Sequence, residues 1–337
     1  MLVTGGLGFI GSHFIRKFLA DAKNDVTLFN IDNMSQGSNS ANVEDVASDS
    51  RYHFILEDIN SVSSIPSLQN IDFIINFAAQ THVDRSISNP FSFTNSNYIG
   101  TLNLLEYVRK KDVKLFVQVS TDEVYGEANP DSPFKETDRL NPGNPYSASK
   151  AAADLMVGSF VRTYGIKAIV TRCTNNFGPN QNPEKLIPRT IIRILLSMPV
   201  YLYGDGSHFR DWIYVEDHVD AILSLIVKGK PGNLYNISAF NQMSNIEIVH
   251  RIGEIIEKKT QLPAKIMFTQ DRPGHDRCYS IDSAKLFLET NWKPSFNFDA
   301  ALEKTIDWYI NNRKWWQGSV NESLAEPNPW TIQNDQT

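Results

Sequence analysis

LVTGGLGFIGSH, at residues 2–13, is the stretch that decides the fold. It reads as a very short apolar strand, a glycine-rich turn and the start of a helix. Gly6, Gly8 and Gly11 fit the pattern G-x-G-x-x-G, and Gly5 with the last two fits G-x-x-G-x-x-G. In either register the backbone can approach a pyrophosphate at a helix N-terminus. The turn therefore predicts a dinucleotide-binding site at the start of the chain.

The next predicted strand, residues 26–32, ends in Asp32, which lies 21 positions after Gly11. A carboxylate at this place accepts hydrogen bonds from both hydroxyls of the adenosine ribose and repels a 2′-phosphate. No Lys or Arg occurs at residues 33–36 to hold such a phosphate. The sequence therefore predicts NAD as the cofactor, in preference to its phosphorylated form. Residues 33–50, rich in Ser, Asn and Gly, are predicted to be a surface loop.

Apolar strands and helical patterns alternate through the first half of the chain. Further strands are predicted at residues 52–56, 72–79, 114–120 and 168–173. The segment 72–79 is apolar on both faces, as a strand buried between helices must be. The pattern predicts an α/β fold, a Rossmann-type doubly wound parallel sheet with a smaller mixed α/β substrate-binding lobe.

We expect residues 1–174 to form mainly the NAD-binding domain and residues 175–312 mainly the nucleotide-sugar-binding lobe. Some strands and helices of the second part are expected to return to the large domain. Predicted helices at 215–228, 245–260 and 299–311 complete the smaller lobe. Residues 313–337 form a C-terminal tail with Trp315, Trp316 and Trp330 among polar residues, and no function is predicted for it.

Composition excludes several classes of function. A formal net charge of -6, with no run rich in Lys and Arg, argues against nucleic acid or an anionic membrane as a partner. The two cysteines, Cys173 and Cys278, are too few for a disulfide framework or a thiolate metal site, and no metal site is predicted. The chain has no leader-like N-terminus and no apolar run long enough to span a membrane, so a cytoplasmic location is expected.

The strand at 116–120 ends in a hydroxyl and two adjacent carboxylates, Thr121, Asp122 and Glu123. In a parallel α/β sheet the carboxyl ends of the strands open onto the ligand crevice. An isolated Thr-Asp-Glu fits a solvated turn better than a catalytic group, so this assignment depends on the residues that accompany it.

Tyr146 and Lys150 are four residues apart on a predicted helix and share a face. An ammonium group near a phenol, with a positively charged nicotinamide also nearby, lowers the tyrosine pKa and prepares it as a general base. The spacing alone is common on amphipathic helices. After a dinucleotide fold and a strand that ends in hydroxyl and carboxyl groups, it indicates an active site.

Together, the glycine turn, Asp32 and the Tyr146/Lys150 pair resemble the extended short-chain dehydrogenase/reductase family. More narrowly, STDEVYG at 120–126, NNFGP at 175–179 and PEKLIP at 183–188 are similar to motifs of the dTDP-glucose 4,6-dehydratases. Epimerases and decarboxylases of the larger family share the Tyr/Lys pair but usually lack the Asp-Glu pair. The resemblance covers nearly the whole chain, up to about residue 309.

The motifs and the resemblance predict two sets of binding residues. Those expected to bind NAD are Gly5, Gly8, Phe9, Ile10, Gly11, Asp32, Asn33, Ser35, Asp58, Ile59, Phe77, Ala78, Ala79, Ser96, Tyr146, Lys150 and Asn176. Those that the resemblance places on the nucleotide sugar are Thr81, His82, Asp84, Thr121, Asn175, Lys185, Leu186, Tyr201, Tyr203, Arg210, Asn245, Arg272 and His275. Separated arginines and a lysine are what a diphosphate needs. Taken alone, His82 fits a structural histidine better.

The resemblance implies an internal redox dehydration. Tyr146, with Lys150, takes the C4 hydroxyl proton while hydride passes to NAD, and Thr121 hydrogen-bonds the forming ketone. Glu123 then removes the C5 proton and Asp122 protonates the departing C6 hydroxyl, before hydride returns to C6. Two neighbouring carboxyl groups in a closed site cannot both ionise cheaply, which separates their pKa values into one acid and one base.

Other readings remain open on sequence alone. The chain could act on a UDP- or CDP-sugar, or be a UDP-sugar 4-epimerase or decarboxylase that leaves Asp122 and Glu123 idle. A more distant alternative is a nucleotide-binding protein without catalysis. The resemblance also implies a homodimer, in which helices at 97–110 and 146–164 pack against their copies as a four-helix bundle.

Overall fold

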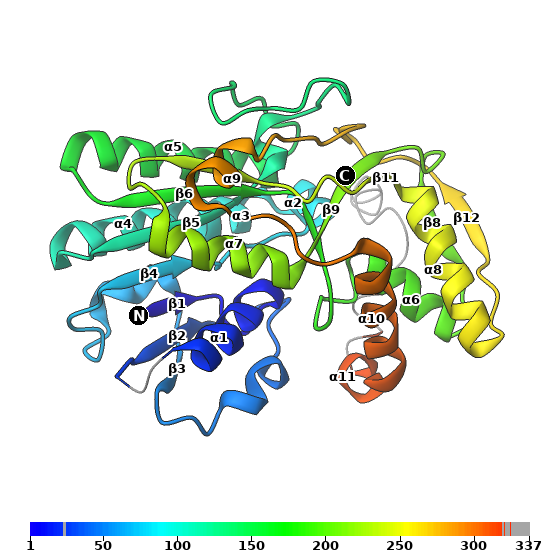
Figure 1. Ribbon diagram of the computed structural model, residues 1–337, viewed down its shortest axis with the longest axis horizontal. Helices are drawn as coiled ribbons and strands as arrows, with labels where there is room; N and C mark the ends of the chain where they lie inside the picture. Colours follow the sequence, from blue (N-terminus) through cyan, green and yellow to red (C-terminus); the bar gives the residue numbers. More distant parts are fainter. Residues whose placement is uncertain (23–24, 319, 321–323, 325–337) are drawn as a thin grey trace, which may run out of the picture.

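The computed structural model describes residues 1–22, 25–318, 320 and 324. Within this part of the chain seven strands form one parallel sheet (Figure 1). From edge to edge they are β10 (Leu234–Ile237), β6 (Ala168–Cys173), β5 (Leu115–Thr121), β4 (Phe73–Asn76), β1 (Leu2–Thr4), β2 (Leu28–Asp32) and β3 (Tyr52–Leu56). The chain reverses its direction of winding between β1 and β4, which creates a crevice at the carboxyl ends of these strands. The predicted doubly wound sheet is confirmed.

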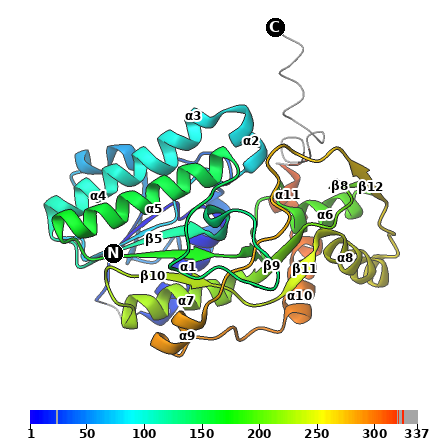
Figure 2. The same ribbon diagram turned by 90° about the horizontal axis from the view of Figure 1, so that it is seen from above.

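Helices cover both faces of this sheet, as Figure 2 shows from above. On one face α4 (Gly100–Lys111) and α5 (Pro145–Tyr164) pack side by side over Phe116 and Val170. On the other face lie α1 (Phe9–Asp21), α7 (Val215–Lys228) and α9 (Ala284–Thr290). Because both faces are covered, all seven residues of β5 are buried.

The remaining elements form a second lobe and its connections. Two small sheets have the orders β11-β9-β7 and β12-β8, with bounds β7 (Asn175–Phe177), β8 (Val200–Tyr203), β9 (Phe209–Tyr214), β11 (Gln242–Ser244) and β12 (Ile266–Thr269). Around them lie α6 (Leu186–Leu195), α8 (Asn245–Thr260), α10 (Phe298–Asn311) and α11 (Arg313–Gln317). Their apolar faces share one core with Trp212 and Tyr309.

Short helices complete the connections. They are η1 (Ser40–Val46), η2 (Ile59–Ser64), α2 (Val83–Ser88), α3 (Pro90–Phe93), the π-helical η3 (Thr94–Ile99) and η4 (Asp122–Tyr125). None of the described helices is long and apolar enough to cross a membrane.

The structure differs from the prediction at several points. The helix predicted at 215–228 for the smaller lobe is α7, which packs on the large sheet instead. The strand predicted at 72–79 ends at Asn76, because its last residues leave the sheet to border a cavity. The surface loop predicted at 33–50 contains η1, which buries Asn42. In the predicted tail, the Trp316 side chain is fully buried. Trp330 lies outside the described residues.

Candidate active site

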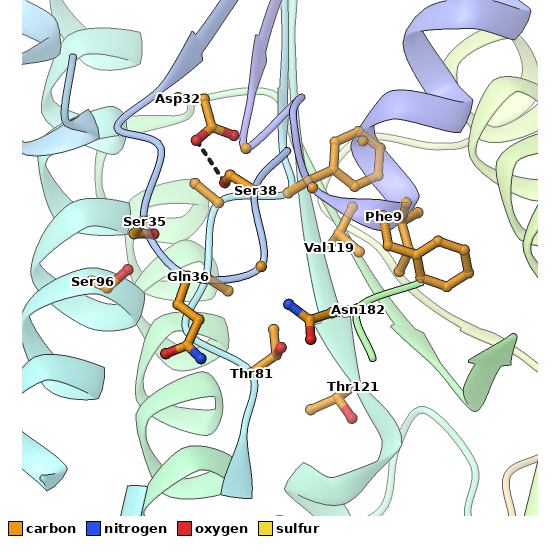
Figure 3. Close-up of a pocket in the computed structure, with 18 of the residues that line it drawn as sticks. Phe9, Asp32, Ser35, Gln36, Ser38, Thr81, Ser96, Val119, Thr121 and Asn182 are labelled. Carbon is orange, nitrogen blue, oxygen red and sulfur yellow. Dashed lines mark hydrogen bonds between the residues drawn. The ribbon is translucent and has the colours of Figure 1, made fainter. Parts of the chain in front are cut away.

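A cavity of about 260 Å³ opens at the carboxyl ends of the central strands (Figure 3). Its walls come from the turn after β1, the ends of β2, β4, β5 and β6, and the start of α5. Every residue predicted to bind the cofactor lines it. The topology brings them together because parallel strands deliver their carboxyl ends to the same edge.

The glycine turn is shaped to let a ligand approach its backbone. Gly5 has a φ of +67°, and a Cβ there would lie 2.7 Å from the backbone of Ala78. A Cβ on Gly11 would lie 2.5 Å from the carbonyl oxygen of Gly5. Gly8 precedes α1 and has no side chain to cap it, so the first N–H groups of the helix are left for a ligand. This is a cradle for an anionic group.

Asp32 ends β2 at the opposite wall of the cavity. Its carboxylate accepts hydrogen bonds from Leu7 N at 3.0 Å, Met34 N at 2.8 Å and Ser38 Oγ at 2.8 Å (Figure 3). Burial raises its pKa, and these three bonds oppose that shift. A carboxylate offers about four lone-pair sites, so Asp32 can still accept from a ribose. The glycine cradle and this carboxylate fit the predicted NAD.

The end of β5 carries the hydroxyl and the two carboxyl groups. Thr121 and Glu123 line the cavity, and Asp122 lies behind them, 3% exposed. The Thr121 hydroxyl donates to Asp122 Oδ1 at 3.2 Å, while Asp122 Oδ2 has no partner. Burial, and then the charge of Glu123, raise the pKa of Asp122 well above its ordinary value. The arrangement therefore favours the protonated form of Asp122 beside Glu123.

Tyr146 and Lys150 begin α5 and face the same cavity. The predicted lowering of the tyrosine pKa, which also counts on the nicotinamide charge, stays a prediction. Burial, followed by the charge of Glu123, raises the pKa of Tyr146 well above its ordinary value. The Lys150 ammonium donates to Val119 O at 2.7 Å, which holds it against the end of β5.

Four of the residues predicted on the substrate line the cavity, and they are Thr81, Thr121, Asn175 and Lys185. The Lys185 ammonium donates to Thr81 O at 2.7 Å. Burial lowers the pKa of Lys185, and Glu184 opposes that shift. These residues bring a cation to the side of the cavity next to Glu123.

Five other predicted substrate residues lie outside the cavity wall, in a buried polar network. Arg272 Nη1 pairs with Asp84 Oδ1 at 3.2 Å, and the Tyr203 hydroxyl donates to Asp84 Oδ2 at 2.9 Å. Arg210 Nη2 lies 3.0 Å from His275 Nε2. Both guanidinium groups therefore already have protein partners. Arg272 Nε is buried and has no partner among the described residues.

The last four predicted substrate residues also lie off the cavity wall. His82 precedes α2, with its Nε2 4.0 Å from Glu184 Oε2, and burial lowers its pKa to about 4. Leu186 packs on the core of the second lobe, and the Tyr201 ring lies under Arg193. Asn245 begins α8, and its buried Oδ1 has no partner among the described residues.

One cluster in the described chain has the composition of a metal site, namely His208, Asp271 and His275. An arginine can only donate, so His275 Nε2 accepts from Arg210 and the proton of His275 is on Nδ1. That N–H donates to Asp271 Oδ1 at 2.6 Å. His208 stacks on His275 and contacts Asp271 Oδ2 at 3.1 Å. The cluster is a hydrogen-bonded chain that orients Arg210.

Sequence reasoning missed several residues of this region. The Tyr279 hydroxyl donates to Asp276 Oδ2 at 2.9 Å and lies 3.5 Å from Glu123 Oε2. The Arg210 guanidinium lies over the Tyr279 ring, 4.3 Å from its centre. Glu184 lines the cavity and pairs with Arg85 at 3.1 Å. No local pattern marks Tyr279 or Asp276, and Glu184 lies in the PEKLIP motif at 183–188 without a role being predicted for it.

Comparisons with known proteins agree with this geometry. The family model for GDP-mannose 4,6 dehydratase matches residues 2–305. The dTDP-glucose 4,6-dehydratase of Salmonella typhimurium is 40% identical, over 94% of each chain.

Solved structures give the same picture. The dTDP-glucose 4,6-dehydratase DesIV of Streptomyces venezuelae, solved with NAD bound, has a TM-score of 0.89 and 38% identity, over 94% of this chain and 98% of that one. UDP-glucose 4-epimerase of Thermotoga maritima has a TM-score of 0.84 and 29% identity, over 93% and 99%.

Proposed function

The chain belongs to the family of the dTDP-glucose 4,6-dehydratases, and from that premise we propose that it is an NAD-dependent hydro-lyase. It converts dTDP-glucose to dTDP-4-keto-6-deoxyglucose. The observation that carries the proposal is the buried Asp122, whose pKa is raised beside Glu123 at the end of β5. An acid and a base next to each other are needed for elimination of water, and a simple epimerase has no use for them.

The cavity residues would hold NAD as follows. The glycine turn receives the pyrophosphate, Asp32 the ribose hydroxyls, and Asp58 with Ile59 the adenine. When bound, NAD accepts hydride from C4 of the sugar and returns it to C6. Because it is regenerated in each turnover, we expect it to stay bound as a prosthetic group.

Oxidation begins at Tyr146, which takes the proton of the C4 hydroxyl. The Thr121 hydroxyl donates to the oxygen that becomes the ketone. Lys150 supplies a positive charge one helical turn further along α5. The burial that raises the Tyr146 pKa also excludes water, so each nearby charge acts more strongly on the phenol.

Elimination uses the two carboxyl groups. Once C4 is a ketone, the C5 proton is acidic, and Glu123 removes it. Asp122 is kept protonated by its burial and by the Glu123 charge, so it can give its proton to the departing C6 hydroxyl. One carboxyl group therefore acts as base and its neighbour as acid, and water is released.

The nucleotide part of the substrate is proposed to contact the second lobe. Lys185 reaches the cavity, and Arg210 and Arg272 lie in the polar network beside it. For the arginines to hold a diphosphate, its oxygens would join or replace their present acceptors. The other proposed substrate contacts are Thr81, His82, Asp84, Asn175, Leu186, Tyr201, Tyr203, Asn245 and His275.

A side-by-side assay with dTDP-, UDP-, CDP- and GDP-glucose tests this function. We expect dTDP-glucose to give a 4-keto-6-deoxy sugar, detected by its absorbance in alkali. Formation of a 4-epimer instead would support the epimerase alternative. Absence of turnover with all four would leave the non-catalytic reading.

We further propose a homodimer in the cytoplasm. In its support, α4 and α5 form an outer layer (Figure 2) on which Leu155 and Tyr164 are exposed by 61% and 51%. Leu155 is a large apolar side chain left open to solvent in the middle of this layer, which suits contact with a partner copy. Both cysteines are free and buried, which agrees with a reducing compartment.

A further inference from the structure

Two segments from distant parts of the chain border the cavity. Residues 36–38 follow β2, and Gln181 and Asn182 follow β7. A Cβ built on Gly37 would lie 3.8 Å from Asn182 Nδ2, and Figure 3 draws Gln36 and Asn182 near each other. A dinucleotide in the cavity would lie under both segments.

Asn42, in η1 just after the first segment, connects them. Its Nδ2 donates to Leu7 O at 2.9 Å, in the glycine turn. Its Oδ1 accepts from Asn180 Nδ2 at 3.2 Å and from Trp315 Nε1 at 2.9 Å. Because a carbonyl can only accept and an indole N–H can only donate, the orientation of this amide is fixed. Asn42 is 1% exposed, so water does not compete for these bonds.

The second segment is anchored at its base as well. Asn180, with a φ of +64°, accepts from Arg16 Nη2 at 3.2 Å. The Tyr309 hydroxyl of α10 donates to Gln181 O, and Gln181 Nε2 donates to Asn176 O at 2.7 Å. The segment therefore has few free torsions, and its contact with Asn42 fixes its distance from the first segment.

Trp315 brings the end of the described chain into this arrangement. It lies in α11, where its ring meets the edge of Trp308 at 5.0 Å between centroids. The hydrogen bond from its indole N–H to Asn42 joins the second lobe to η1 of the large domain. Trp308 lies beside it, and its indole N–H makes no hydrogen bond to any described residue, which provides a matched control.

We propose that Asn42 and Trp315 are positioning residues that hold the two segments closed over NAD and so set how slowly the cofactor leaves. The inference rests on the proposed function only in taking NAD as the occupant of the cavity. For the dinucleotide to leave, the segments must separate, and this breaks the Asn42–Asn180 bond. Without the Trp315 indole, the Asn42 amide loses one of its three hydrogen bonds. The two segments then separate more often.

The test measures release of cofactor in the absence of sugar. Wild type, Trp315→Phe, Asn42→Leu and the control Trp308→Phe are loaded with NADH, and an excess of NAD traps the empty site while nicotinamide fluorescence is followed. We expect Trp315→Phe to release NADH about 2- to 10-fold faster, the factor for one net hydrogen bond. Asn42→Leu should release it on the order of 10-fold faster or more, because three bonds are lost. Trp308→Phe should match wild type.

Each result has a definite meaning. If Trp315→Phe releases NADH as slowly as wild type while its melting temperature is unchanged, the proposal is overturned. Release that is equally fast in Trp308→Phe would also overturn it, because the effect would then come from packing. With saturating NAD, Trp315→Phe should recover the wild-type kcat and KM for the sugar. A wild type that binds no dinucleotide would overturn the proposed function, and this inference with it.

Discussion

At the scale of single residues, the proposed chemistry depends on two adjacent carboxyl groups in different surroundings. Asp122 is buried behind Glu123, and its pKa is raised well above the ordinary value first by burial and then by the Glu123 charge. Arg210 lowers it, but by less. Asp122 is therefore suited to act as the acid because it is buried at the start of η4, and Glu123 is suited to act as the base because it lines the cavity.

The two half-reactions should separate by mutation. Glu123→Gln leaves Tyr146 in place, so C4 oxidation should proceed, and reduced nicotinamide should accumulate because elimination stalls. Removal of the base should lower turnover by a factor of about 10² to 10⁴. Tyr146→Phe should block formation of reduced nicotinamide itself. Rapid-mixing absorbance with dTDP-glucose compares both variants with wild type, and a wild-type rate for Glu123→Gln would contradict the assigned role.

Asp122 also affects stability. The pKa of Asp122 is higher in the folded than in the unfolded chain. In acid, where Asp122 is protonated in both the folded and the unfolded chain, it costs no stability. As the pH rises above the unfolded pKa, only the unfolded chain loses the proton easily, so the free energy of unfolding falls. Asp122→Asn should therefore raise the free energy of unfolding at pH 7 by about 1 kcal/mol. Below the unfolded pKa the difference should vanish. Urea unfolding of the two proteins at pH 7 and in acid measures this, and an Asp122→Asn variant less stable than wild type at pH 7 would argue against a protonated Asp122.

At the scale of elements, α5 places Tyr146 and Lys150. Asn144 caps this helix, accepting from Ser147 N at 2.9 Å, and Ser147 Oγ accepts in return from Asn144 N at 3.2 Å. The capping box fixes the first turn, and Tyr146 is its second residue. The position of the phenol is therefore coupled to the helix end.

This coupling can be tested against a second capped helix. Asn144→Ala should cost about 1 kcal/mol of stability and also lower kcat, because the first turn that holds Tyr146 loosens. The control is Asn297→Ala, since the Asn297 side chain caps α10 by accepting from Ala300 N at 3.1 Å, away from the cavity. It should lose similar stability, measured by thermal unfolding, but keep kcat. Equal kcat losses in both variants would mean that global destabilisation is the cause.

How much could be predicted from the sequence also differs between elements. The helices predicted at 215–228 and 245–260 have those bounds in the structure, because their periodicity is strong, and S-x-x-E marks the start of α8. Much of the cofactor wall could likewise be predicted, because most of its residues lie near a strand end or in the glycine turn, and Tyr146 and Lys150 share one face of α5. Asp84 and Arg272 are different. In the sequence, each looks like an ordinary polar residue of a turn. They form an ion pair only because the second lobe packs against the large domain.

At the scale of the whole molecule, the outer layer of α4 and α5 determines the proposed assembly. Leu155→Lys puts a charge in the middle of this layer and should convert the homodimer to a monomer in light scattering at micromolar concentration. Leu288, 76% exposed on α9, offers a matched control, because Leu288→Lys adds the same charge on the opposite face of the sheet. A monomeric wild type would refute the dimer.

The order of the strands also has a consequence for synthesis. The chain leaves the large sheet after β6, builds β7, α6, β8 and β9, and returns only with α7 and β10, which pairs with β6. A chain made from its N-terminus therefore has no strand to pair with this edge of β6 until residues 234–237 have been added, so the large sheet is completed only after part of the second lobe has been made.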